Sequence, residues 1–466
     1  MAFWGIRPKQ SSDQPSFSSR LSLRPKAAVV LLGAGASASV GAPLMRGFVD
    51  RGRDYLARGI FADDVKPHIS DTLDLYGALR AHFQITEEDL DNIENVLSIS
   101  ELRKLVPLPN LPALTETSTA SVQRFIEAVL VKAIRLPGPE SGEWVGVHFG
   151  PPQKRLLAAI WRLGQPSAII TLNYDCILEY CSYCLGLPFT YEPNACGGVE
   201  ILKLHGSINW MQCSNRGCEE ADRVAVAPLE YRPTDKQDYG TVELNASSCK
   251  SCGAPQRPLI VPPTWAKDLQ HPVLRATWAR ALEVLAKAEV LAVVGYSLPA
   301  ADPQVRQLLH AGLSSANLRQ ALVSVGGDEL AVERWKQFFR GSWRDYRLHV
   351  TNQTFDFVAN SELLAVLGVS IADFGHDQLQ LLPVPQSPGI NCEVRERLSQ
   401  MMKEKGICNA AGGEIGVNWR DEIQRRRNGT ASDSSQYAPL IRELGLDWRP
   451  SGPLLPVHGS HFYCNE

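Results

Sequence analysis

Two polar side chains that come directly after apolar strands are the first candidates for catalysis in this sequence. Asn173 follows the predicted strand Ser167–Thr171, and His205 follows the predicted strand Glu200–Leu204. Because parallel strands end at one edge of a sheet, where ligands bind, we expect the two side chains to lie near each other. Imidazole titrates close to neutral pH, so His205 is a candidate general base. A lone histidine is more often structural, and Asn173, like Asp175, could simply cap the helix that follows.

A glycine-rich turn follows a third apolar strand. The predicted strand Ala28–Leu32 leads into the turn Gly33-Ala34-Gly35-Ala36-Ser37, after which a helix is expected to begin. Glycine lets the backbone approach a ligand, and the N–H groups and dipole of a helix start favour an anion. The pattern therefore predicts a phosphate cradle. Its spacing departs from the usual dinucleotide fingerprint, because the next glycine is Gly41.

Four cysteines form two close pairs. Cys213 and Cys218 precede about 30 residues of expected polar loop, and Cys249 and Cys252 follow it. Four thiolates in two pairs suit tetrahedral zinc, and four sulfur ligands leave no open position for catalysis. We therefore expect a structural zinc ribbon. The cysteines between Cys176 and Cys184 have helical spacing, which favours buried packing over a rival metal site.

The composition excludes several classes of protein. The chain has 466 residues, with 47 basic and 50 acidic side chains, so no net field points to nucleic acid or to an anionic membrane. Eleven cysteines, several of them clustered, favour a reducing compartment over a secreted disulfide framework, and the cytoplasm is the expected location. The uncharged stretch Ala27–Met45 contains too many glycine, serine and proline residues for a good membrane helix.

The order of the predicted elements indicates an α/β protein. Further apolar strands are expected at Val290–Val294 and Ala321–Val325, with helices at Pro152–Arg162 and Val273–Lys287. At least four strands then end in Gly, Ser, Asn or His residues, as in a parallel, doubly wound sheet with helices on both faces. The expected organisation is a flexible arm (1–25), a main domain (26–352) with a helical insertion (about 50–150) and a ribbon (about 207–258), and a C-terminal helical region and tail (353–466).

Five motifs occur in the order in which they occur in sirtuins. They are Gly33-Ala34-Gly35-Ala36-Ser37 with Gly41-Ala42-Pro43 and Arg46, Thr171-Leu172-Asn173-Tyr174-Asp175, Leu204-His205-Gly206, the two cysteine pairs, and Gly295-Tyr296-Ser297-Leu298. The chain thus resembles the sirtuin superfamily over roughly Lys26 to Val350. The resemblance implies a Rossmann-like NAD-binding domain with a small zinc-ribbon module and a helical module beside the cleft.

The resemblance also implies roles for individual residues. The glycine turn would hold the pyrophosphate of NAD, and Pro43 and Arg46 would belong to the flexible cofactor loop. Asn173 and Asp175 would line the nicotinamide and ribose pocket, where the amide of Asn173 can hold the attacking oxygen. His205 would act as the base on the ribose. Gly295 and Ser297 would contact the phosphate or ribose of the cofactor.

The group that attacks the sugar decides the reaction. An acyl-lysine oxygen would make the chain an NAD-dependent protein deacylase, whereas water would make it an NAD+ hydrolase. Two departures from deacylating sirtuins favour water. Pro262-Pro263-Thr264-Trp265 replaces a Phe-Gly-Glu strand ending that pairs with the substrate peptide, and proline lacks the N–H that such pairing needs. Leu44-Met45 replaces the usual Asp-Phe of the cofactor loop. The cysteine ribbon that this chain retains is, in contrast, a feature that it shares with deacylases.

The helical insertion, the extra C-terminal region and Tyr174 are similar to bacterial sirtuin-like proteins of antiphage defence, which deplete NAD. This similarity implies that the C-terminal region carries self-association or docking of a partner such as an ATPase or a sensor. A non-catalytic NAD or ADP-ribose sensor is a further alternative. The presence of both Asn173 and His205 argues against it, because a sensor needs neither a base nor a residue that holds water.

Overall fold

The computed structural model describes much of the chain up to residue 369 and one short strand near the carboxyl end. The described residues are 25–82, 93, 95, 96, 98, 99, 116–138, 150–164, 166–185, 187–191, 198–233, 239–244, 248–261, 271–300, 302–340, 348–369 and 461–462. Residues 1–24 of the expected arm, the Pro262–Trp265 segment and nearly all of the expected C-terminal region lie outside them. Within the described part, no helix is both long enough and apolar enough to cross a membrane.

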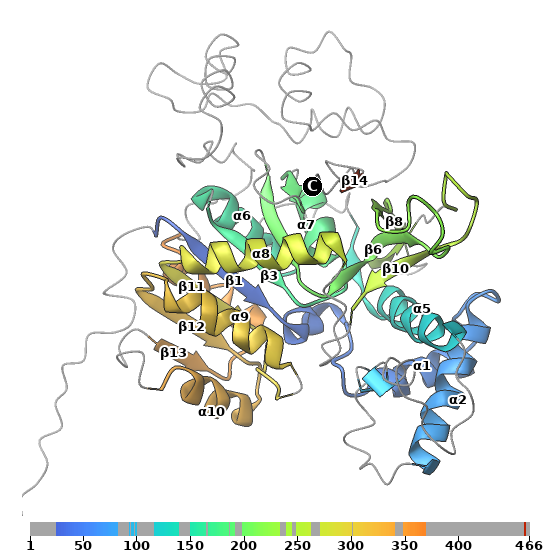
Figure 1. Cartoon of the computed structure of the whole chain (residues 1–466). Helices are drawn as coiled ribbons and strands as arrows, with labels where there is room; N and C mark the ends of the chain where they lie inside the picture. The colour runs from blue at the N-terminus through green and yellow to red at the C-terminus, as the bar shows by residue number, and fades with distance from the viewer. Residues whose placement is uncertain are drawn as a thin grey trace, which may run out of the picture.

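A seven-stranded parallel sheet forms the centre of the molecule (Figure 1). Its order is β13-β12-β11-β1-β3-β5-β4, and every neighbouring pair is parallel. The strands are β1 (Ala28–Leu32), β3 (Ala168–Thr171), β4 (Phe189–Thr190), β5 (Val199–Lys203), β11 (Val290–Val294), β12 (Gln320–Ser324) and β13 (Leu348–Thr351). The chain leaves β1 toward β3 on one side and later returns to β11 on the other. The strand order therefore switches beside β1, where ligand crevices form in such sheets.

Helices cover both faces of this sheet because its strands are apolar on both faces. Val29 and Leu31 of β1 belong to one buried cluster, and Ala28, Val30 and Leu32 belong to the other. The first cluster lies under α8 (Pro272–Ala286), α9 (Pro303–Ser314) and α10 (Glu329–Phe338). The second contains α6 (Gln153–Leu163), α7 (Ile177–Leu185), α11 (Phe355–Val358) and α12 (Glu362–Val366). The buried core thus continues beyond residue 352.

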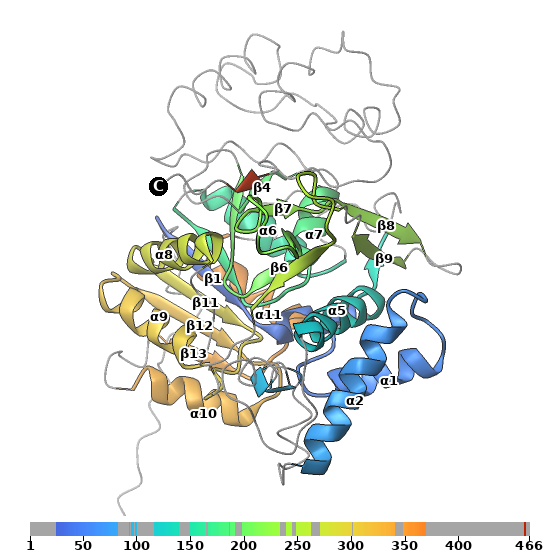
Figure 2. The same cartoon turned by 45° about the vertical axis from the view of Figure 1, so that its right-hand side comes forward.

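A helical module stands beside the carboxyl end of the sheet, as Figures 1 and 2 show. It consists of α1 (Phe48–Ala57), α2 (Lys66–His82) and α5 (Glu116–Ala133). The rings of Phe48 and Phe125 pack with their centroids 6.1 Å apart. A side chain at Gly52 would meet the Phe125 ring at 2.4 Å, so the glycine permits this close helix contact.

Two small antiparallel sheets surround the cysteine pairs. One has the order β10-β6-β7-β14 and the other β2-β9-β8. Their strands are β2 (Leu136–Pro137), β6 (Gly206–Cys213), β7 (Val224–Val226), β8 (Leu229–Pro233), β9 (Tyr239–Leu244), β10 (Gln256–Ile260) and β14 (His461–Phe462). The expectation of a polar loop between the cysteine pairs was wrong. Buried residues such as Val224, Leu229 and Val242 drive strand formation within this otherwise polar stretch.

The predicted parallel sheet is confirmed, and its five predicted strands lie within one residue of their observed limits. Ala321–Val325 was expected to be the last strand, but β13 follows it at the edge of the sheet. The two-residue strand β4 was also missed. The helix expected after the glycine turn is η2 (Ala34–Val40), a 3₁₀ helix rather than an α-helix.

Candidate active site

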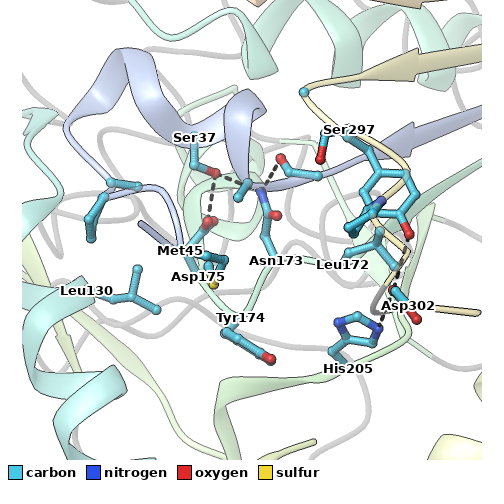
Figure 3. Close-up of a pocket in the computed structure, with 17 residues that line it drawn as sticks. Ser37, Met45, Leu130, Leu172, Asn173, Tyr174, Asp175, His205, Ser297 and Asp302 are labelled. Carbon is cyan, nitrogen blue, oxygen red and sulfur yellow. Dashed lines mark hydrogen bonds and ion pairs between the residues drawn. The ribbon is translucent and has the colours of Figure 1, made fainter. Parts of the chain in front are cut away.

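A cavity opens where the strand order switches, between the carboxyl ends of β11, β1 and β3 (Figure 3). The space between its walls, with the open solvent at its mouth included, is about 680 Å³. Its wall is formed by Gly33, Ala34, Ser37, Ala42, Pro43, Met45, Leu130, Leu172, Asn173, Tyr174, Asp175, His205, Gly295, Tyr296, Ser297, Pro299 and Asp302. Segments far apart in the sequence therefore meet at one site.

Three glycines allow the turn after β1 to pack closely against the turn after β11. Gly35 N donates to Gly295 O at 2.9 Å. A side chain at Gly33 would lie 2.6 Å from Gly295 O, and one at Gly295 would lie 2.2 Å from Ala36 N. Gly295 also has a φ of +67°, a conformation that side chains disfavour. Only glycine fits at this crossing, so the two turns pack backbone against backbone.

A chain of hydrogen bonds fixes the side chain of Asn173. Its Nδ2 donates to Gly33 O at 3.0 Å and to Ser37 Oγ at 2.9 Å. Ser37 in turn donates to Asp175 Oδ2 at 2.7 Å. Figure 3 shows these three side chains together on one wall. Because both contacts of Asn173 use the amide nitrogen, its Oδ1 can accept a hydrogen bond from a water molecule in the cavity.

Asp175 is a buried carboxyl at this wall. Desolvation by burial raises its pKa above the ordinary value of 3.8, although Lys203 and the hydrogen bond from Ser37 act in the opposite direction. Its Oδ1 also accepts from Ile177 N at 3.1 Å, at the first residue of α7. The helix-capping interpretation of Asp175 and its position in the cavity are thus compatible.

A buried polar network supports this wall from behind, and the sequence interpretation missed it. Lys203 Nζ lies 2.9 Å from Glu179 Oε1 and donates to Ser207 Oγ at 2.8 Å and to the main-chain oxygen of Asp175. Tyr191 donates to Glu179 Oε1 at 2.6 Å. Desolvation acts to lower the pKa of Lys203, but Glu179 and neighbouring groups outweigh it and raise the pKa. In the sequence, the indications of this network are Lys203 in the otherwise apolar end of β5 and Glu179 in the apolar helix α7.

His205 lies on the opposite side of the cavity from the Ser37–Asp175 pair. Its Nε2 is 3.7 Å from Asp302 Oδ2, and its ring centroid is 6.2 Å from that of Tyr174. Tyr296 donates to Asp302 Oδ2 at 3.2 Å. His205 and Asp302 are both almost completely buried. The sequence interpretation proposed no role for Asp302, which precedes α9 and is an ordinary helix cap in sequence.

Most of the residues proposed as a site from the sequence come together here. Gly33, Ala34, Ser37, Pro43, Asn173, Asp175, His205, Gly295 and Ser297 line the cavity. Gly35 lies beneath the turn, where it contacts Gly295 rather than the cavity. Arg46 is exposed and is not part of the wall, whereas its neighbour Met45 is. The roles assigned to these residues remain predictions.

The four predicted zinc ligands form a compact cluster. The sulfurs of Cys213, Cys218, Cys249 and Cys252 all lie within 4.8 Å of one another. The Cys213–Cys252 and Cys218–Cys249 sulfurs are 3.5 and 3.8 Å apart. Tetrahedral zinc with bonds of about 2.3 Å requires sulfurs about 3.8 Å apart. The cluster therefore fits a zinc ion that would tie the β6 and β10 ends together.

No protein-family model matches this chain, and no curated protein matches it. Among solved structures it is similar to a serine-to-alanine mutant of a Sir2 homologue in complex with ADP-ribose, with 17% identity, 76% of this chain and 96% of that chain covered, and a TM-score of 0.37. It is also similar to Sir2Tm bound to a propionylated peptide, with 14% identity, coverage of 74% and 95%, and a TM-score of 0.32. For a Sir2 homolog–NAD complex the identity is 16%, the coverage 64% and 78%, and the TM-score 0.30. Similarity at this level does not define an activity, which depends on the side chains of the cavity.

Proposed function

We propose that this chain is a sirtuin-like NAD+ hydrolase, which cleaves the nicotinamide–ribose bond and releases nicotinamide and ADP-ribose. The observation that carries the proposal is that Asn173 and His205 line one cavity beside the glycine turn. The order of the five motifs, which resembles that of sirtuins, supports the choice of NAD+ as the substrate. Gly33 and Ala34, at the start of η2, line the cavity, and the start of a helix favours an anion such as its pyrophosphate.

The reaction needs few groups. As the bond between ribose C1′ and nicotinamide N1 breaks, its electron pair leaves with nicotinamide and positive charge develops on the sugar. A water oxygen then bonds to C1′, and the proton that this water loses must be accepted. Oδ1 of Asn173 can orient the water, and the imidazole of His205 can take its proton. The buried wall limits the access of other water molecules.

The edge of β10 favours water over an acylated peptide as the attacking group. In deacylating sirtuins the peptide is added as a strand after the ribbon. Here α5 packs against β10, and Gln123 Nε2 donates to Ile260 O at 3.1 Å from a buried position. The N–H of Val261 points toward β6, because it donates to His205 O. The carbonyl of Ile260 belongs to the same peptide unit and points the opposite way, toward the free edge of β10. An added strand would have to displace Gln123 from this edge.

A role as an NAD+-depleting effector of bacterial antiphage defence forms the second part of the proposal. It is supported by the resemblance of the helical insertion, the extra C-terminal region and Tyr174 to such proteins. Self-association, or a partner such as an ATPase or sensor, would then control the activity. Cells that express the chain should lose NAD+ after phage infection, and cells that express Asn173→Ala should not.

The test of the reaction is nicotinamide release from NAD+ by the purified full chain, with and without acyl-lysine peptides. Release without peptide supports hydrolysis. Release that requires peptide would instead establish a deacylase, the alternative that the intact cysteine cluster favours. Binding of NAD+ without release in both reactions would indicate a sensor. Asn173→Ala and His205→Ala should each abolish release, whereas Asp50→Asn, at an exposed position on α1, should not.

A further inference from the structure

The turn after β11 contains a strained residue at the edge of the cavity. Among the described residues other than glycine, only Leu298 has a positive φ, of +53°. Leu298 is completely buried and directly follows Ser297, which lines the cavity (Figure 3). A left-handed conformation at a residue other than glycine costs energy, and it persists only where the surroundings hold the backbone in place. The contacts of this turn therefore identify the residues that maintain its shape.

Two side chains of α10 hold successive carbonyl groups of this turn. Trp335 Nε1 donates to Tyr296 O at 2.8 Å, and Arg334 Nε donates to Ser297 O at 2.8 Å. In a trans peptide the N–H of the next residue points opposite to the carbonyl, so the N–H groups of Ser297 and Leu298 point away from these donors. Within the part of the chain that the structure describes, neither N–H group has an acceptor. The turn thus directs its acceptors to α10 and keeps two donors for a ligand.

Arg334 is itself held by an acidic partner at the start of α10. Its Nη2 donates to Asp328 Oδ2 at 3.1 Å, while Asp328 Oδ1 accepts from Ala331 N at 2.9 Å and caps the helix. The guanidinium thus links the capped start of α10 to the backbone of Ser297. The side chain of Arg334 is 33% exposed, so its replacement opens no cavity in the core and leaves Asp328 in contact with water.

We propose that Arg334 is a positioning residue that holds the turn at Ser297 in the shape that binds NAD+. The inference rests on the proposed function for the identity of the ligand. With the guanidinium in place, Ser297 and the strained Leu298 are ordered before the ligand arrives, so binding does not have to order them. Asn173 and His205 lie on other segments of the chain. Arg334 therefore contributes to the affinity for NAD+ and not to the cleavage of the bond.

Arg334→Met removes the guanidinium and keeps an unbranched side chain that suits a helix. Because a hydrogen bond from a charged donor is lost, KM for NAD+ should rise about tenfold, while kcat for nicotinamide release changes less than about twofold. Lys336→Met is the matched control, since it removes the same charge from the same helix. Lys336 pairs with Glu333 at 2.8 Å, both side chains are exposed, and neither lines the cavity, so KM should be unchanged.

Calorimetric titration of the full chain with ADP-ribose gives a readout that does not depend on activity. The Kd should rise about tenfold in Arg334→Met, whereas its Tm without ligand should stay close to that of Lys336→Met. A purely structural role would instead lower Tm and leave Kd unchanged. That result, or equal Kd values in the two variants, would overturn the inference. If the wild type binds ADP-ribose but releases no nicotinamide from NAD+, the proposed function fails, and the Kd comparison still decides the role of Arg334. A wild type that binds neither molecule would overturn both.

Discussion

Replacement of Lys203 by methionine should destabilise the chain strongly, because it leaves a buried carboxylate without its cation. Glu179 is 0% exposed, and Lys203 Nζ lies 2.9 Å from its Oε1. Methionine matches the length and volume of lysine, so the change removes charge and hydrogen bonds without opening a large cavity. Tyr191 would still donate to Glu179, but a neutral donor cannot replace a charge.

The magnitude follows from the burial of the pair. Removal of one member of a buried ion pair costs about 3–5 kcal/mol, most of it from the charge left behind. The hydrogen bonds from Lys203 to Ser207 and to the main-chain oxygen of Asp175 are lost as well, so the upper part of this range is expected. At about 2–4 °C per kcal/mol for a large domain, a loss of about 3–5 kcal/mol lowers Tm by about 6–20 °C. Loss of the Asp175 contact should also weaken NAD+ binding.

Urea unfolding followed by tryptophan fluorescence measures the effect, since the buried Trp210 packs against Tyr191 with ring centroids 5.2 Å apart. The double variant Lys203→Met/Glu179→Gln is the critical comparison. Because it removes both charges, it should be more stable than Lys203→Met alone. A loss below about 1 kcal/mol in Lys203→Met, or a double variant that is less stable than the single one, would show that Lys203 does not offset a buried charge on Glu179.

Three further predictions follow from the site and the ribbon. Gly295→Ala should abolish NAD+ binding and lower Tm more than the control Gly326→Ala. Both glycines have positive φ, but only at Gly295 would an added Cβ meet backbone, at 2.2 Å from Ala36 N. Equal losses of Tm in thermal unfolding would contradict this. Purified chain should contain about one zinc ion by atomic emission, and Cys249→Ser should lose it while Cys181→Ser, a buried cysteine outside the cluster, keeps it. Burial raises the pKa of Asp175 above the value of 3.8 that it has in the unfolded chain, so the folded chain loses stability as the pH rises above 3.8. Asp175→Asn should therefore raise Tm at about pH 7 but not near about pH 3.5. An Asp175→Asn protein whose Tm is lower than wild type at pH 7 would show that the charge is stabilising.

The central sheet could be predicted because its strands are buried on both faces. β1 and β11 are continuous apolar runs of five residues, and no helical periodicity competes with them. β13 lacks this property, since all four of its residues are only half buried at the edge of the sheet. The strands between the cysteine pairs give weaker signals: β7 has only three residues, and in β8 Glu230 and Arg232 interrupt the apolar residues.

In the candidate site, too, some residues could be predicted from the sequence and others could not. Asn173 and His205 could be found because each follows a strong strand, and the strand ends meet at one edge. The contact between His205 and Asp302 joins a residue that follows β5 to the residue that precedes α9, and nothing in the sequence specifies that pairing. Arg46 was predicted from resemblance alone, and its side chain is exposed outside the cavity wall. Contacts across the fold therefore had to come from the structure.

The most direct test of the account is a crystal structure of the His205→Ala variant with NAD+, in which the substrate should remain intact. We expect the pyrophosphate on the Gly33–Ser37 turn and the nicotinamide ribose between Asn173 and the space left by the imidazole. NAD+ bound elsewhere, or bound here with its ribose away from Asn173, would contradict it.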